Sequence, residues 1–153
     1  ATVGYGVIEA DGMHFRTVDY GAVTTPANTP FDIRLEMIYD GICELCDRYK
    51  PDAASVEELF FNTNITTGIA VGHSRGVILL ALRKSGVGFY EYTPLQVKQS
   101  VVGYGRAEKK QVMIMTKTIL GLERMPRPDD AADALALAVC HAHSAKSQLL
   151  GLM

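Results

Sequence analysis

Apolar side chains recur at steps of three and four residues between positions 31 and 49. This spacing puts them on one face of a helix, and it predicts an amphipathic helix that ends before Pro51. The stripe consists of Phe31, Leu35, Ile38, Ile42, Leu45 and Tyr49. We interpret it as part of the hydrophobic core.

Strands are predicted on both sides of that helix. Residues 3–9 and 15–23 flank Ala10-Asp11-Gly12, where Asp-Gly is a strong signal for a hairpin turn. Residues 24–30 form a predicted loop. Downstream, the pattern predicts strands over 53–61 and 87–92, a helix over 66–84 between them, and two further helical segments joined by 103–110.

The order of these elements is typical of a single α/β domain. No internal repeat, low-complexity tract or linker divides residues 1–153. With 153 residues and 48% hydrophobic content, the chain can bury a full core without disulfides. No apolar run approaches the roughly 18 residues of a membrane span, so we expect no membrane association.

The predicted helix over 66–84 carries three glycines at steps of four, which places Gly68, Gly72 and Gly76 along nearly one face. A glycine inside a helix costs about 1 kcal/mol relative to alanine, so a close approach to this face is expected. Two partners fit that approach. One is the protein's own sheet, and the other is the same helix of a second protomer.

A pair of aspartates opens the last predicted helix. Pro128 or Asp129 is a natural helix start, and it leaves Asp130 and Asp133 as i,i+3 neighbours on one face of the first turn. Such a pair is suited to binding a cation. The alternative is that these carboxylates only cap the helix and complement its dipole.

A third acid, Glu57, lies on the predicted strand over 53–61. Open α/β sheets place their chemistry at the carboxyl ends of strands, so Glu57 is expected to face the aspartates there. Three carboxylates supply the oxygen ligands that Mg²⁺ or Mn²⁺ requires, and they suit attack of water on a phosphodiester. The alternative is a surface glutamate at a strand exit.

Positive charge is concentrated in the middle of an acidic chain whose net charge is −2. Residues 75–127 hold 10 Lys and Arg against 3 Asp and Glu, whereas residues 1–74 hold 4 against 11. A basic segment between proposed metal ligands is useful for guiding a phosphate backbone. A solvated basic surface is the alternative.

Cysteine and histidine give little support for a zinc site. Cys43-x-x-Cys46 lies within the first predicted helix, and no second Cys pair completes a site, although Cys140-His141-Ala142-His143 is suggestive. We interpret His141 and His143 as ordinary helix or surface residues. With three cysteines and no obligatory disulfide set, the chain suits a reduced cytoplasm.

Seven stretches of the sequence together resemble the RuvC family of Holliday-junction resolvases along nearly the whole chain. They include Val56-Glu57-Glu58-Leu59-Phe60-Phe61, Ser74-Arg75-Gly76-Val77, Ala107-Glu108-Lys109 and Asp130-Ala131-Ala132-Asp133-Ala134-Leu135-Ala136. The others are Val3-Gly4-Tyr5-Gly6-Val7-Ile8-Glu9, Arg34-Leu35 and Gln96-Val97-Lys98-Gln99-Ser100-Val101-Val102-Gly103.

This resemblance implies an RNase H-like α/β fold, with a mixed sheet flanked by helices, and a homodimer that nicks two opposed strands of a four-way DNA junction during recombination and repair. It implies Mg²⁺, two ions per active site, with Mn²⁺ as a possible substitute. A branch-migration motor of the RuvA/RuvB type is the implied partner.

The resemblance also assigns roles to individual residues. By position, Glu57, Asp130 and Asp133 match three of the four catalytic acids and would bind the metal. Lys98 and Lys109 match lysines near the scissile phosphate, where a cation stabilises the charge that grows in the transition state. The expected DNA contacts are Phe60, which matches a base-stacking aromatic, and Arg75, Lys98, Arg106, Lys109 and Lys110. For Arg106 and Lys110, a solvated role fits equally well.

The first acid of the family pattern falls before Ala1. Family members begin with a short apolar strand that ends in Asp-Pro-Gly, and this sequence starts just after that point. We therefore expect further residues before Ala1. If that acid is absent, the alternative function is a junction-binding protein without catalysis. A second alternative, an actin-like or Hsp70-like nucleotide-binding module, would need a second subdomain and glycine-rich phosphate loops that the 153 residues do not supply.

Overall fold

The structure is a computed structural model, and it describes residues 2–12, 14–58 and 65–149. Its first two strands form a hairpin. Strands β1 (Thr2–Asp11) and β2 (His14–Thr24) pair in antiparallel fashion from Thr2↔Thr24 to Asp11↔His14, with a register shift between Val7 and Ile8. Gly12 at the turn has a φ of 62°, a conformation that glycine adopts readily. The hairpin predicted around Asp-Gly is confirmed.

A second pair of strands runs in parallel. Strand β3 (Ala53–Glu57) pairs with β4 (Gly88–Tyr92) from Ala53↔Gly88 to Glu57↔Tyr92. A parallel pair needs a crossover, and helix α2 (Ile65–Lys84) supplies it. The strand predicted over 53–61 is too long: β3 ends at Glu57, Glu58 lies outside it, and residues 59–61 are not among those described.

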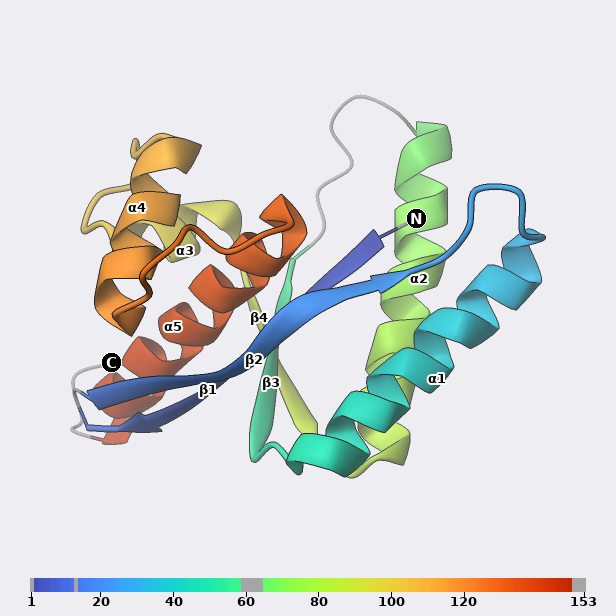
Figure 1. The fold of residues 1–153 in the computed structure, drawn as a ribbon, viewed down its shortest axis with the longest axis horizontal. Helices are drawn as coiled ribbons and strands as arrows, with labels where there is room; N and C mark the ends of the chain where they lie inside the picture. The colour runs from blue at the N-terminus through green and yellow to red at the C-terminus, as the bar shows by residue number, and fades with distance from the viewer. Residues whose placement is uncertain (1, 13, 59–64, 150–153) are drawn as a thin grey trace.

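Helices cover both sides of these strands (Figure 1). Helices α1 (Phe31–Tyr49) and α2 lie on one side, and α3 (Pro94–Val101), α4 (Lys109–Leu120) and α5 (Asp129–Leu149) lie on the other. The predicted ends of α1 and the predicted start of α5 are confirmed. No helix in the described part of the chain combines the length and apolar character needed to cross a membrane.

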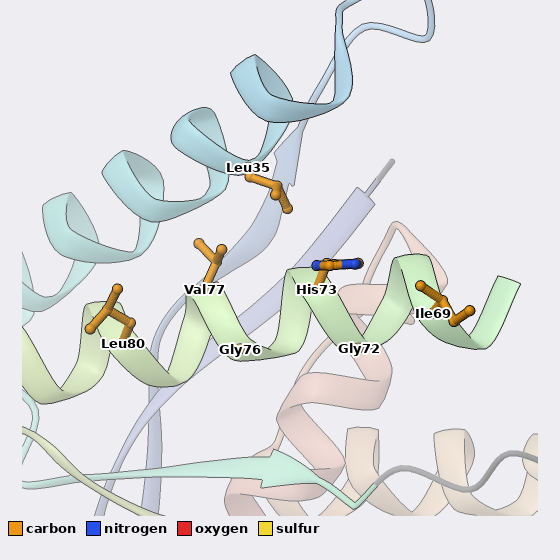
Figure 2. Close-up of a pocket in the computed structure, with 7 residues that line it drawn as sticks. All are labelled: Leu35, Ile69, Gly72, His73, Gly76, Val77 and Leu80. Carbon is orange, nitrogen blue, oxygen red and sulfur yellow. The ribbon is translucent and has the colours of Figure 1, made fainter. Parts of the chain in front are cut away.

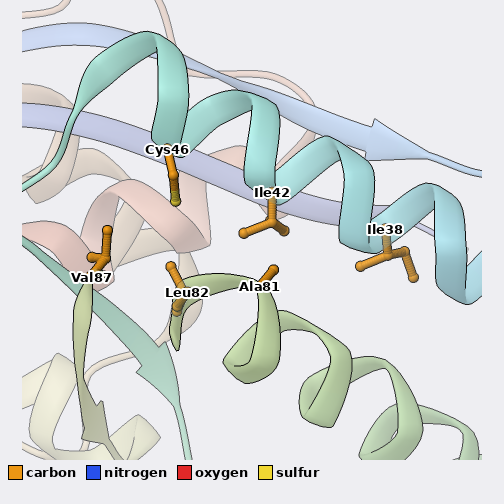
Figure 3. Close-up of a cluster of buried hydrophobic side chains, with 6 residues drawn as sticks. All are labelled: Ile38, Ile42, Cys46, Ala81, Leu82 and Val87. Atoms are coloured by element: carbon orange, nitrogen blue, oxygen red, sulfur yellow. The ribbon is translucent and has the colours of Figure 1, made fainter. Parts of the chain in front are cut away.

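The hydrophobic core has two parts, one on each side of the strands. In the first, side chains of α1 and α2 and Val87 point toward one another (Figure 3). Its buried members are Ile38, Ile42, Cys46, Ala81, Leu82 and Val87. The stripe predicted on the first helix is therefore core at Ile38 and Ile42, whereas Phe31 stays 42% exposed.

The second part of the core holds α5 against the strands. Leu135 and Val139 on α5 are fully buried, together with Val101 and Leu120 from α3 and α4. Ser55 on β3 also donates a hydrogen bond from its Oγ to the carbonyl oxygen of Leu137, at 3.0 Å. Helix α5 thus packs on both strand pairs, and this packing determines the position of its N-terminus.

Candidate active site

Glu57 occupies the last position of β3, as a site at the carboxyl end of a strand requires. Its backbone is held on two sides. The amide of Glu58 donates to the carbonyl oxygen of Tyr92 at 2.9 Å, which extends the parallel pairing by one residue. The Nε of Arg75 donates to the carbonyl oxygen of Glu57 at 3.2 Å.

The two aspartates lie at the start of α5, on the exposed side of its first turns. Between them, Ala131 and Ala132 are 0% and 2% exposed, because they face the protein interior. Asp130 and Asp133 are exposed. The amides of Ala131 and Ala132 donate to the carbonyl oxygen of Pro128, at 2.9 and 3.3 Å, and close the first turn. The sequence Asp-Ala-Ala-Asp therefore turns both carboxylates away from the core.

Strand β1 sets the position of this turn through two glycines. A Cβ added at Gly4 would lie 2.1 Å from the carbonyl oxygen of Asp130, and one at Gly6 would lie 2.7 Å from Cδ2 of Leu135. Real Cβ atoms do not approach other atoms so closely, so α5 reaches this depth only because these positions lack side chains. Gly4 and Gly6 are two residues apart and therefore lie on one face of the strand. Glycines in this pattern indicate a close approach by another element, and the sequence alone could have pointed to it.

The charges of Asp133 and Lys109 both act on the carboxyl of Glu57. Partial burial raises the pKa of the Glu57 carboxyl above its usual range, the negative charge of Asp133 raises it further, and Lys109 acts in the opposite direction. The Nζ of Lys109 lies 3.4 Å from Oδ2 of Asp133. Residues 24 to 76 positions apart in sequence thus share one site at the end of β3.

The chemistry of this donor set fits a divalent cation. The negative charge of Asp133 opposes ionisation of Glu57, and a cation bound beside the two carboxylates would offset that repulsion. Carboxylate oxygens are also the ligands that Mg²⁺ prefers. Among the residues that the structure describes, no three His, Cys, Asp or Glu side chains form a group able to hold a metal by themselves. Metal binding by Glu57, Asp130 and Asp133 therefore stays a prediction.

The predicted DNA contacts have different surroundings. Arg106 is exposed in the segment between α3 and α4, and Lys110 is exposed in the first turn of α4. Lys109 begins α4 beside Asp133. Lys98 is half-buried on α3. Arg75 is paired within the protein, and its side chain is only 17% exposed. Phe60 lies outside the described residues. These DNA contacts stay predictions.

His141 and His143 on α5 contact side chains of neighbouring elements. Nδ1 of His141 lies 2.7 Å from the hydroxyl oxygen of Tyr92, and its ring stacks on Tyr90. Nδ1 of His143 lies 3.0 Å from Oγ of Ser100. Cys140 is buried and, like the other two cysteines, free. The interpretation of His141 and His143 as ordinary helix residues agrees with these contacts.

The raised pKa of Glu57 leads to a stability prediction. We expect Glu57→Gln to raise the unfolding temperature of the metal-free protein at neutral pH. A carboxyl with a raised folded-state pKa contributes stability below its unfolded pKa and loses that contribution as the pH rises through the folded pKa. Glutamine does not ionise, so the variant keeps this stability at neutral pH.

The difference between variant and wild type should vanish near a pH of about 4 and grow toward neutrality. Thermal unfolding in a metal chelator at several pH values measures it, with Glu58→Gln as the matched control for loss of a neighbouring carboxylate. An unfolding temperature for Glu57→Gln at or below that of wild type at neutral pH would contradict the prediction.

Comparison with known proteins gives a consistent match along the chain. The family described as "Crossover junction endodeoxyribonuclease RuvC" matches residues 1–141. Proteins of that name are similar to this chain in Ruminiclostridium cellulolyticum, at 56% identity over 144 residues, and in Alkaliphilus metalliredigens, at 55% over 150 residues. The alignments cover 94% and 98% of this chain, and 87% and 92% of those proteins.

Solved structures match as well. The structure titled "Thermus thermophilus RuvC structure" superposes with a TM-score of 0.89 at 37% identity, and covers 96% of this chain and 90% of that one. The structure "T. thermophilus RuvC in complex with Holliday junction substrate" has a TM-score of 0.89 at 34% identity, and covers 99% of this chain and 96% of the other.

Proposed function

We propose a residue-level mechanism on the premise that the chain belongs to the RuvC family of crossover junction endodeoxyribonucleases. The RNase H-like α/β fold expected from the sequence is confirmed by the solved RuvC structures that it matches. The protein is an endodeoxyribonuclease that resolves Holliday junctions. The observation that carries the mechanism is the shared electrostatic environment of Glu57, Asp133 and Lys109 at the end of β3.

Glu57, Asp130 and Asp133 would hold the metal in this mechanism. Bound Mg²⁺, two ions per site, or Mn²⁺ in its place, would activate a water molecule and stabilise the oxygens of the scissile phosphate. Strand β3 and the first turns of α5 present the carboxylates from two rigid elements.

Lys109 and Lys98 supply positive charge near the phosphate in this proposal. Lys109 lies beside Asp133 at the N-terminus of α4, so its ammonium group is close to the carboxylates without being one of the ligands. A cation there stabilises the charge that develops on the phosphate oxygens in the transition state. Arg106 and Lys110 are exposed, as attraction of the DNA backbone requires.

We further propose that two copies of the chain associate through α2. A Cβ added at Gly72 or Gly76 would meet nothing within 4 Å, so these glycines do not pack on the protein's own sheet. They line an open groove of about 470 Å³ together with Leu35, Ile69, His73, Val77 and Leu80 (Figure 2). Ile69 and Leu80 are each 53% exposed, and a partner helix would cover this apolar surface.

Gly76→Glu tests the dimer. The groove has room for the new side chain, and glutamate favours a helix over glycine by up to about 1 kcal/mol, so the fold should keep its stability. We expect the variant to sediment as a monomer at concentrations where wild type is a dimer, because burying the carboxylate in an apolar contact is unfavourable. Thr118→Glu, on the exposed surface of α4, is the control. A dimer of unchanged affinity in Gly76→Glu would exclude α2 as the interface.

A dimer with two-fold symmetry presents two active sites to two arms of a junction. Paired incision follows from that arrangement. The family also implies cooperation with a branch-migration motor of the RuvA/RuvB type, and a cytoplasmic location. The alternative function, junction binding without cleavage, differs from this proposal in a single observable, which is strand scission.

Cleavage of a synthetic four-way junction with each strand labelled in turn tests the proposed function. We expect nicks in two opposed strands at symmetric positions, in the presence of Mg²⁺ or Mn²⁺. A linear duplex of the same sequence should stay intact. Nicks in a single strand, or equal cleavage of the duplex, would contradict a junction resolvase.

A further inference from the structure

Arg75 connects three elements at the edge of the candidate active site. It lies on α2, its Nε donates to the carbonyl oxygen of Glu57 on β3 at 3.2 Å, and its terminal nitrogen forms an ion pair with the carboxylate of Glu91 on β4. A guanidinium presents several donors in a fixed plane, so it can serve two acceptors at once where an ammonium cannot. We call these two contacts the Arg75 clamp.

The clamp acts where the pairing of β3 and β4 ends. Glu91 lies opposite Val56 in the register. One residue past the end of β3, the amide of Glu58 donates to the carbonyl oxygen of Tyr92. The clamp therefore fixes the backbone of Glu57 directly. Since a carboxylate is placed by its own backbone, movement there would displace the Glu57 side chain.

The same arginine lies next to the proposed dimer surface. Gly72 and Gly76 line the groove on α2, and Arg75 is the residue before Gly76, with its side chain directed to the strands. A shift of α2 is thereby passed to the Glu57 carbonyl through one side chain. The Arg75 side chain is 17% exposed, so most of its surface is covered by protein.

We propose that Arg75 is a positioning residue for Glu57, which couples the placement of that carboxylate to α2 and to Glu91. This inference rests on the proposed catalytic role of Glu57. It differs from the role that the sequence suggested for Arg75, which was contact with the DNA backbone. The two roles predict different measurements, because a positioning residue affects the chemical step and a phosphate contact affects binding.

The test compares Arg75→Gln, Glu91→Gln and the double variant in single-turnover cleavage at saturating junction. Partners that orient metal ligands typically contribute about 10- to 100-fold, so we expect Arg75→Gln to lower the cleavage rate about tenfold while the junction Kd changes less than about twofold. Glu91→Gln should lower the rate in the same direction. The double variant should be no slower than Arg75→Gln, because both changes break one clamp.

Arg75→Lys keeps the positive charge but loses the planar guanidinium that can donate to two acceptors at once. Its cleavage rate should therefore lie between those of Arg75→Gln and wild type. Arg83→Gln, which removes an exposed arginine from the same helix, is the matched control and should leave both rate and Kd unchanged. A weaker Kd with a salt dependence reduced by about one ion and an unchanged rate would establish the phosphate contact instead. An unchanged rate and Kd would also overturn the proposal.

Hydrogen exchange of the Glu58 amide in the metal-free, DNA-free protein gives a second readout that does not need activity. Loss of the clamp should speed exchange at Glu58 in Arg75→Gln and in Glu91→Gln, but not in Arg83→Gln. Wild-type exchange in both clamp variants would overturn the inference. If wild type itself fails to cleave the junction, the proposed function fails, and the exchange measurement still decides whether the clamp holds Glu57.

Discussion

Glu57→Gln is expected to lower the rate of junction cleavage by at least about 100-fold while leaving junction affinity within a few-fold of wild type. Glutamine has nearly the same shape, but its neutral amide is a poor ligand for Mg²⁺ compared with a carboxylate. Stabilisation of phosphate charge by a bound metal contributes several kcal/mol, and about 2.7 kcal/mol corresponds to 100-fold in rate. Single-turnover cleavage and junction binding, measured on the same preparation, separate the two effects.

Glu58→Gln is the control, because it removes the next carboxylate along the chain at an exposed position just past β3. We expect it to retain cleavage within a few-fold of wild type. An equal loss of cleavage rate in the two variants would show that the rate depends on the total negative charge of this segment and not on the position of Glu57. Cleavage by Glu57→Gln at the wild-type rate would show that Glu57 is not a catalytic residue.

Gly4→Ala is expected to impair both folding stability and cleavage, although residue 4 carries no functional group. Its Cβ would lie 2.1 Å from the carbonyl oxygen and 2.2 Å from the carbonyl carbon of Asp130. Both atoms belong to backbone, which cannot rotate away as a flexible side chain can. Overpacking of this kind costs about 1–3 kcal/mol, and it forces β1 and α5 apart.

Displacement of α5 carries Asp130 and Asp133 with it, and a misplacement of 1 Å can cost about 100-fold in rate. Chemical denaturation and single-turnover cleavage measure the two effects. Gly88→Ala is the matched control, since it is also a strand glycine and its Cβ would meet nothing within 4 Å. A Gly4→Ala protein with wild-type stability and wild-type cleavage would contradict the close approach of β1 and α5.

Much of the fold follows from local patterns. The stripe from Phe31 to Tyr49, the Asp11-Gly12 turn and the prolines before Asp129 each determine structure within a few residues, so their elements appear where predicted. The spacing of Asp130 and Asp133 also defines one helix face without tertiary information. The end of β3 did not follow, because an apolar run continues through 59–61 and the sequence does not mark where pairing with β4 stops.

The parts of the site that sequence did not reveal depend on contacts between distant segments. Lys109 and Asp133 come together only because α4 and α5 pack against each other. Arg75 was predicted to contact DNA, and nothing local in the sequence indicates that its guanidinium turns toward Glu57 and Glu91. For Gly72 and Gly76 the sequence left two packing partners open, and only the structure shows that the protein's own sheet is not one of them.

The single-turnover rate of junction cleavage as a function of Mg²⁺ concentration tests the central claim most directly. The mechanism predicts no cleavage in chelator, a rate that rises and saturates with Mg²⁺, and no cleavage of a linear duplex at any Mg²⁺ concentration. Tight binding of the junction without strand scission across the whole Mg²⁺ range would contradict it, and would identify this chain as a junction-binding protein.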